Sequence, residues 1–172
     1  VSGLGNEVIV LNDSGSVAAT TLTTVAALTT DGNVSASNAI AISGTADEVT
    51  AALVTNTTNV VASLATVAIS DSGSIASTVL ASIAAKTSGT VTASNITEIT
   101  EAAATIGTDA AIVVSALVVA PNAAVTITDA ISAADLNLIT DETDGVVTAT
   151  ISDGAVAATL AAIGDVDAND VI

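Results

Sequence analysis

Three evenly spaced aspartates constrain the fold of this chain more than any other feature. Asp13, Asp71 and Asp129 mark a fixed period, since 71 − 13 and 129 − 71 both equal 58. The sequence NDSGSV around Asp13 aligns with SDSGSI around Asp71, and the residues around Asp129 follow more loosely. A fixed period is typical of repeat proteins, in which each repeat packs on the next one and no single globular core forms.

Each of these long repeats contains a second strand-like run. The runs cover residues 34–42, 91–96 and 147–151, and in each one aliphatic residues alternate with small or polar ones. Alternation with a period of two is typical of strands whose two faces differ in burial. We therefore expect β-strands in these three segments.

Short Ala-rich helices are predicted after the strands. Leu22 and Val25 recur as Leu80 and Ile83 at the same offset as the aspartates. Apolar side chains spaced by three or four residues lie on one helix face. The predicted stripes consist of Val17, Leu22, Val25 and Leu28 in the first helix and of Ile75, Leu80 and Ile83 in its repeat.

Local signals mark where the helices begin and end. Residues 45–48 (TADE) form a capping box, in which the Thr and Glu side chains each bond to the other's backbone N–H. Residues 132–135 (SAAD) are a weaker version, and Asp153-Gly154 is a further predicted cap. Turns rich in Asp, Asn and Gly at residues 30–33 and 143–145 separate a helix from the next strand.

The predicted fold class is α/β, a solenoid of about six strand–helix coils with a stacked parallel β-sheet. Coils of roughly 24 to 32 residues suit one strand and one helix per turn, as in leucine-rich repeats, although that consensus is absent. We expect a single repeat domain over residues 1–172, with long repeats at about 8–65, 66–122 and 123–172. The predicted strands end near Val10, Ile42, Ile69, Ile99, Ile127 and Ile151.

The two ends of the sequence resemble each other. Residues 169–172 (NDVI) repeat the pattern of residues 6–9 (NEVI), and neither end has the polar capping coil that closes a solenoid. We expect a segment of a longer array or a subunit that stacks head to tail on its copies. Such a heterologous contact propagates as a filament.

The composition argues against catalysis. The chain has no Cys, Met, His, Trp, Tyr or Phe, and Lys86 is its only basic residue. Acid–base catalysis near neutral pH usually uses His, and phosphate chemistry uses Arg or Lys. No Gly-x-Ser-x-Gly motif is present. We expect no enzymatic activity and no required cofactor. Lys86 repeats the position of Leu28, so its stem is predicted to lie over apolar surface with the charge in solvent.

The net charge of −17 limits the partners of the chain. Nucleic acid and anionic membrane surfaces would repel it. No apolar run reaches the roughly 20 residues that a bilayer-spanning helix needs. We therefore expect neither nucleic-acid binding nor membrane insertion, and cations are the natural counterparts of this chain.

Three runs resemble a known group of proteins. SGLGNEV from Ser2, DSGSVAA from Asp13 and ISGTADEV from Ile42 resemble the Ala/Thr/Ser/Val/Asp-rich repeats of very long secreted or cell-surface proteins of bacteria, especially marine cyanobacteria. The resemblance covers most of the chain. It implies export without a classical signal peptide, and a role in surface structure, adhesion or surface-associated motility. Many of these proteins carry calcium-binding nonapeptide repeats, but the pattern Gly-Gly-x-Gly-x-Asp is absent here.

A carboxylate column is the first candidate metal site. Asp13, Asp71, Asp129 and Asp153 would recur at equivalent strand ends, and Ca²⁺ prefers such oxygen ligands. An aspartate just ahead of a helix also accepts the N–H groups of the first turn and suits the positive end of the helix dipole. We favour capping over metal binding for these residues.

The second candidate metal site is near the end of the sequence. Asp165, Asp167 and Asn169 place oxygen-bearing side chains at alternate positions, as in the first half of a calcium loop. Asp170 stands where that loop needs Gly. A solvated acidic turn is the simpler interpretation.

The predicted function is that of a structural repeat module in an extracellular surface protein, fibre, surface layer or adhesin. Its expected partners are copies of itself or neighbouring repeats, in head-to-tail or lateral contact. The alternative is a binding module for Ca²⁺, a cell-surface polysaccharide or an ice surface. The last two would use outward rows of Ser and Thr, although β propensity alone also accounts for these rows.

Overall fold

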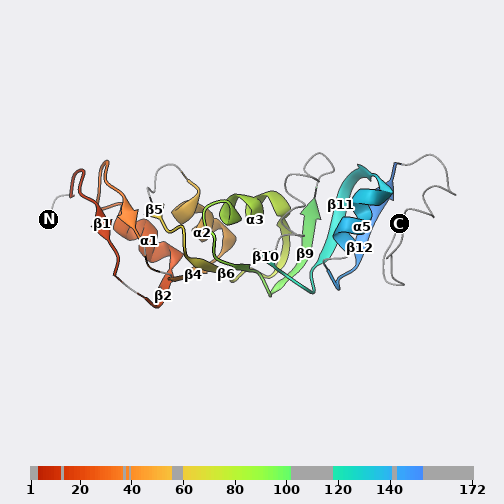
Figure 1. The fold of residues 1–172 in the computed structure, drawn as a ribbon, viewed down its shortest axis with the longest axis horizontal. Helices are drawn as coiled ribbons and strands as arrows, with labels where there is room; N and C mark the ends of the chain where they lie inside the picture. Colours follow the sequence, from red (N-terminus) through yellow and green to blue (C-terminus); the bar gives the residue numbers. More distant parts are fainter. Residues whose placement is uncertain are drawn as a thin grey trace. The chain divides into compact units, whose positions relative to one another are not determined.

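The computed structural model describes residues 4–12, 14–36, 38, 40–55, 60–101, 118–140 and 143–152 (Figure 1). The first sheet has the order β1-β3-β5. The second has the order β10-β8-β6-β4-β2, and the third has the order β12-β11-β9-β7. The strands are β1 (Ile9–Val10), β2 (Ser16–Ala18), β3 (Val34–Ser35), β4 (Ala41–Gly44), β5 (Val60–Val61), β6 (Thr66–Ile69), β7 (Gly73–Ala76), β8 (Val91–Thr92), β9 (Ile96–Glu101), β10 (Val118–Val119), β11 (Ala124–Ile131) and β12 (Val147–Ile151).

Helices follow strands along the described chain. They are α1 (Ala19–Ala26), α2 (Ala46–Leu53), α3 (Ser77–Ala84) and α5 (Ala133–Thr140). The strand pairs are parallel. The prediction of an α/β fold with parallel strand pairing is therefore confirmed. The strands divide among three sheets instead of forming one, because the chain passes from one sheet to another between successive strands, as from β1 to β2 and from β6 to β7.

Two compact units make up the chain, one formed by Val1–Asp71 with Val79–Ala93 and the other by Ser72–Thr78 with Ser94–Ile172. In the first unit, Ser16 pairs with Ala41, and Ala41 pairs with Thr66. The number of residues between the two partners is the same in both pairs. Parallel neighbours need a crossover connection, and in two of these crossovers the connection contains α1 or α2.

The core of the first unit is thin and aliphatic. Helix α1 buries Ala19, Leu22 and Ala26, which lie on one helix face. The inward residues Ile42 and Val67 of β4 and β6 are 0% and 1% exposed. Burial of each large aliphatic side chain contributes about 1.5–3 kcal/mol. The unit therefore depends on many small, repeated contacts.

The core of the second unit lies between α5 and two long strands. Leu136 and Ile139 of α5 pack with residues of β11 and β12. The members of this cluster are Val125, Ile127, Ile131, Leu136, Ile139, Val147 and Ala149, with Ile151 partly buried beside them.

The predicted strand ends agree well with the structure. Val10, Ile69 and Ile151 end β1, β6 and β12, and Ile42, Ile99 and Ile127 lie inside β4, β9 and β11. The predicted strand over residues 147–151 is β12. The run over 34–42 instead contains β3 and the beginning of β4, and the run over 91–96 contains β8 and the first residue of β9, because the chain changes sheet within each run.

The predicted helix stripes are correct at their centres and wrong at their ends. Leu22, Leu80 and Ile83 are fully buried. Val17 and Ile75 lie in β2 and β7, because the backbone is still extended at Ala18 (φ −69°, ψ 140°) and the helices begin later. Leu28 lies beyond the end of α1 and is 49% exposed. No helix in the described part of the chain is long and apolar enough to cross a bilayer.

The predicted capping box at the start of α2 is present. The Thr45 side chain accepts from the Glu48 N–H at 3.2 Å, and Glu48 Oε2 accepts from the Thr45 N–H at 2.9 Å. At the start of α5, Ser132 Oγ accepts from the Asp135 N–H at 3.2 Å and donates to Asp135 Oδ2 at 2.7 Å. The Asp153-Gly154 cap lies outside the described residues.

A Thr-x-Gly turn recurs between helix and strand. Thr143 Oγ1 donates to the Ala123 carbonyl at 2.8 Å and accepts from the Gly145 N–H at 3.0 Å. Thr87 makes the same pair of bonds with the Ala65 carbonyl and the Gly89 N–H. A Cβ at either glycine would overlap the carbonyl group of the preceding strand segment. Glycine is therefore required there by close approach of two backbones.

Candidate functional site

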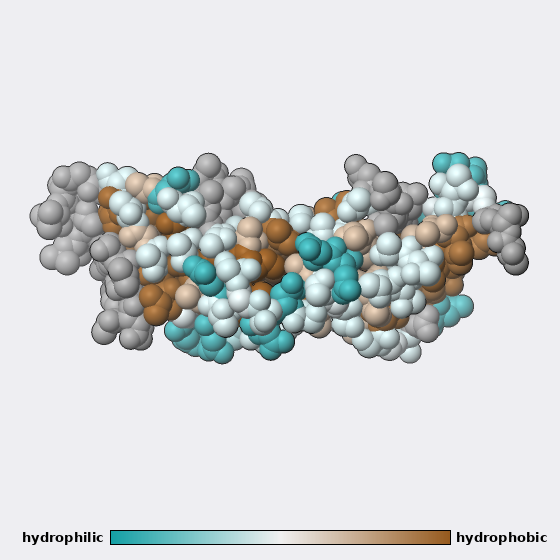
Figure 2. Space-filling model, turned by 180° about the vertical axis from the view of Figure 1, so that it is seen from behind, coloured by the Kyte–Doolittle hydropathy of each residue, from teal (hydrophilic) through white to brown (hydrophobic). Residues whose placement is uncertain are grey.

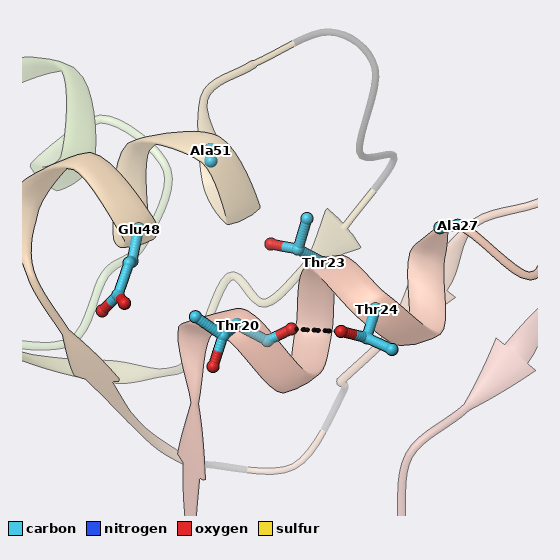
Figure 3. Close-up of a pocket in the computed structure, with 6 residues that line it drawn as sticks. All are labelled: Thr20, Thr23, Thr24, Ala27, Glu48 and Ala51. Carbon is cyan, nitrogen blue, oxygen red and sulfur yellow. Dashed lines mark hydrogen bonds between the residues drawn. The ribbon is translucent and has the colours of Figure 1, made fainter.

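A groove of about 530 Å³ lies between α1 and α2 in the first unit (Figure 3). The α1 side consists of positions i, i+3, i+4 and i+7 of one helix face, and the α2 side of positions i and i+3. This face of α1 lies beside the buried one formed by Ala19, Leu22 and Ala26. The lining residues are Thr20, Thr23, Thr24, Ala27, Glu48 and Ala51.

The polar groups of the groove are largely engaged within the protein. Thr23 Oγ1 donates to the Ala19 carbonyl at 3.1 Å, and Thr24 Oγ1 donates to the Thr20 carbonyl at 2.8 Å. The second of these bonds is drawn in Figure 3. Glu48 is engaged in the capping box of α2. What the groove offers a ligand is mainly methyl groups, the lone pairs of hydroxyl oxygens and one carboxylate.

This chemistry suits weak contact with an apolar or hydroxyl-bearing surface. Covalent catalysis needs a nucleophile next to a base, whereas the Thr23 and Thr24 hydroxyls donate to backbone carbonyls. The sequence contains a signal for the groove, since Thr20, Thr23, Thr24 and Ala27 have helical spacing. The apolar stripe on the adjacent face dominates the pattern, so the groove was not predicted.

Asp71 acts as a cap, but for a different helix from the one predicted. Its Oδ2 accepts from the Ala46 N–H at 2.6 Å, at the first residue of α2. The helix that follows Asp71 in sequence is α3, which begins at Ser77 after the intervening strand β7. Parallel pairing of β4 with β6 brings Asp71 to the start of a helix that precedes it by one crossover connection.

The remaining predicted metal ligands are placed as follows. Asp129 is exposed on β11 and belongs to the second unit, whereas Asp71 belongs to the first. Among the described residues, no three acidic, His or Cys side chains lie close enough to hold a metal ion. The other predicted ligands, Asp13, Asp153, Asp165, Asp167 and Asn169, lie outside the described residues.

A row of threonines runs across the third sheet. Thr126 of β11 pairs with Thr100 of β9 on one side and with Thr148 of β12 on the other. Adjacent strands are about 4.8 Å apart, so the row has a regular spacing. Thr126 Oγ1 donates to Glu98 Oε1 at 2.6 Å, and Thr148 is exposed.

Lys86 is exposed, as is Leu28 at the equivalent position of the preceding repeat. Both residues follow a helix by two positions, and their N–H groups donate equivalent bonds, at 3.0 Å each, to the carbonyls of Ile83 and Val25. The two positions therefore share the same backbone hydrogen bond as well as the same place in the sequence period. At this position Lys86 stands in place of an exposed leucine.

Comparison with known proteins found no matching family model, no matching curated protein and no matching solved structure.

Proposed function

We propose that this chain is a structural repeat module of an extracellular surface protein, fibre, surface layer or adhesin, built as an α/β solenoid of about six strand–helix coils. The observation that carries the proposal is the register of the first unit. In its first sheet, Ile9 pairs with Val34 and Val34 with Val60. In its second sheet, Ser16 pairs with Ala41 and Ala41 with Thr66. Nearly constant intervals between partners in both sheets are what successive turns of one coil produce.

The equivalence of α1 and α3 supports the proposal. Both helices have 8 residues, and they begin at Ala19 and Ser77, which are equivalent positions of the long repeat. Leu22 and Leu80 are each 0% exposed, and Ala26 and Ala84 are each 7% exposed. In a solenoid, every repeat meets the same surroundings, so equivalent residues reach equivalent burial.

Contacts between successive coils support an architectural role. The Asp71 carboxylate joins the third coil to the start of α2 in the second. The Thr87 hydroxyl bonds to the Ala65 carbonyl one turn earlier. Each bond links neighbours in the stack, so stability grows as neighbouring coils are added. The net charge of −17 keeps such a module soluble and separates it from other acidic surfaces.

Deletion of one whole coil tests the architecture. Removing residues 34–59 joins Asn33 to Val60 and places β5 beside β1 and β6 beside β2 in their present register. Removing residues 34–46, half a coil, puts every later strand out of register. We expect cooperative thermal unfolding, followed by circular dichroism, to survive the first deletion with a lower midpoint and to be lost in the second.

Equal loss of folding in both deletions would contradict a stack of nearest neighbours. The extracellular part of the proposal is tested separately with an antibody against the chain. Intact cells of the source organism should bind the antibody, and protease added outside the cells should remove the signal. Labelling only after the cells are broken would contradict the proposed location.

A second candidate is binding of a polysaccharide or an ice surface, favoured by the Thr100, Thr126 and Thr148 row. Periodic hydroxyl and methyl groups match a periodic surface, and Thr148 of this row is exposed while Thr100 and Thr126 are half-buried. The variant Thr148→Val should weaken co-sedimentation with insoluble polysaccharide or the depression of ice growth. The control Thr66→Val changes an exposed threonine in the first unit. Identical behaviour of the two variants and the unmodified chain would exclude a role for the row.

A further inference from the structure

Among the described residues, the first unit has a β edge on which no further strand lies. Strands β1 and β2 are the terminal strands of the first and second sheets, with β3 and β4 as their hydrogen-bonded neighbours. The N–H groups of Ile9 and Leu11 each donate at 2.9 Å, to the carbonyls of Asn33 and Ser35. Alternate residues of a strand direct their backbone groups to opposite sides. The N–H and C=O of Val10 therefore face the side on which the described chain has no strand.

The same holds for β2. The Ala41 N–H donates to the Gly15 carbonyl at 3.1 Å, so Gly15 and Val17 direct their backbone groups toward β4. The backbone groups of Ser16 and Ala18 face the free side. An unpaired row of N–H and C=O groups is a template for a further strand.

Burial along the rows indicates what is missing at this edge. Val17 is half-buried, whereas its row partners Ile42, Val67 and Val91 are 0%, 1% and 0% exposed. Each of these three partners has a strand on both sides, whereas Val17 lies in the terminal strand β2. A strand added next to β2 would extend this row if it placed an aliphatic side chain toward the core and a small side chain toward solvent.

Apolar side chains are exposed near this edge. Leu4, Val8, Val10 and Leu28 are 40%, 58%, 56% and 49% exposed, and the Leu4 N–H donates to the Leu28 carbonyl at 2.6 Å. Figure 2 shows brown, apolar surface beside the grey residues at the N-terminal end of the chain. The backbone template and the apolar side chains thus belong to the same part of the first unit.

We propose that this edge, formed by β1 and β2, binds a parallel strand of a second copy of the chain. The inference rests on the proposed function, because it extends the coil-to-coil contact from within one molecule to between two. The strand pairs within the described chain are parallel. Among the described strands, β12 pairs only with β11 and alternates the inward residues Val147 and Ala149 with the outward Thr148. A copy therefore carries a strand of the required chemistry.

Charge makes this association dependent on salt. Two copies that each carry a net charge of −17 repel each other, and the chain has one basic residue with which to offset the repulsion. The screening length falls from about 30 Å at 0.01 M salt to about 3 Å at 1 M. A contact between backbone edges and apolar side chains survives this screening. Association is therefore weak at low ionic strength and becomes stronger as salt is added.

Sedimentation velocity of the full chain at 0.01 M and 1 M NaCl, over a range of protein concentrations, tests the proposal. We expect monomers at low salt and concentration-dependent dimers and longer species at high salt. The variant Val10→Pro removes an N–H on the free side and leaves the bonds of Ile9 and Leu11 to β3 in place. Loss of one backbone bond weakens association about tenfold.

Two further variants separate edge pairing from other effects. Ser16→Pro blocks the β2 edge in the same way and should weaken association even if Val10→Pro fails to fold. Leu64→Asn is the control, because Leu64 is 53% exposed and lies just beyond β5, at the opposite side of the first sheet, and the substitution leaves the net charge at −17. This variant should associate like the unmodified chain, because Leu64 is not part of the proposed edge. If salt acted only by driving exposed apolar surface together, the variant would associate less than the unmodified chain.

A folded chain that stays monomeric in 1 M NaCl would overturn the second-copy proposal and leave the proposed solenoid intact. Association that Val10→Pro and Ser16→Pro leave unchanged would overturn it too. Folding is checked in the same samples by circular dichroism. An unmodified chain without cooperative unfolding would instead refute the proposed function.

Discussion

The hydroxyl of Ser77 is predicted to destabilise the protein. Ser77 is the first residue of α3 and is 1% exposed, and its Oγ has no hydrogen-bond partner among the described residues. The equivalent position of the preceding repeat, at the start of α1, is Ala19, which is 0% exposed. The repeat thus supplies a natural control, since the chain already uses alanine at the equivalent site.

The size of the effect follows from the buried hydroxyl. A buried polar group without a partner costs about 1–3 kcal/mol. Alanine is also the better helix former, by about 0.5 kcal/mol. Loss of one oxygen atom's packing offsets part of this gain. We expect Ser77→Ala to raise the free energy of unfolding by about 1–2 kcal/mol, and the reciprocal Ala19→Ser to lower it by a similar amount.

The assay is thermal and urea unfolding of the two variants and the unmodified chain. For a chain of this length, 1 kcal/mol corresponds to about 2–4 °C in the unfolding midpoint. Ser77→Ala should therefore unfold roughly 2–8 °C higher. A lower midpoint for Ser77→Ala would refute the reasoning, since the hydroxyl would then make a bond that stabilises the fold.

Two further predictions concern contacts between segments that are distant in the sequence. Gly89→Ala should destabilise the protein by about 1–3 kcal/mol in urea unfolding, because the new Cβ would overlap the Ala65 carbonyl. The control Gly15→Ala should be nearly neutral, because its Cβ would meet no atom within 4 Å. Asp71→Ala should lower the free energy of unfolding by about 0.5–2 kcal/mol, because the Ala46 N–H loses its partner. Asp71→Asn keeps an acceptor and should lower the free energy of unfolding by less. Equal decreases in the two variants would show that the hydrogen bond itself is unimportant.

Local chemistry explains why the sequence predicted many of the elements. The Thr45–Glu48 capping box involves residues three apart, and its pattern does not depend on the rest of the fold. The Asp-Gly turn before β12 likewise follows from backbone preferences at Asp144 and Gly145. The short strands in the run over 34–42 were less predictable, because the bend between β3 and β4 depends on which neighbouring strand each one meets.

The candidate sites, like the helices and strands, were predictable where they depend on local sequence and not where they depend on contacts between distant residues. Asp71 was expected to cap the helix that follows it, but it accepts from the first N–H of α2 instead, because parallel pairing brings it there. The α1–α2 groove also requires two helices that begin at Ala19 and Ala46 to lie side by side. Neither relation is contained in a local pattern.

The sequence by itself determined the long period marked by the three aspartates, the alternation that makes strands, the helix signals and the absence of His and Cys side chains, because each depends on residue types and their spacing along the chain. The tertiary structure alone decided which strands share a sheet, which helix Asp71 caps, that Ser77 is buried, and which strands lie at the edges of the sheets in the described part of the chain. These properties depend on contacts between residues that are distant in the sequence. Such contacts form only when segments far apart in the chain pack together.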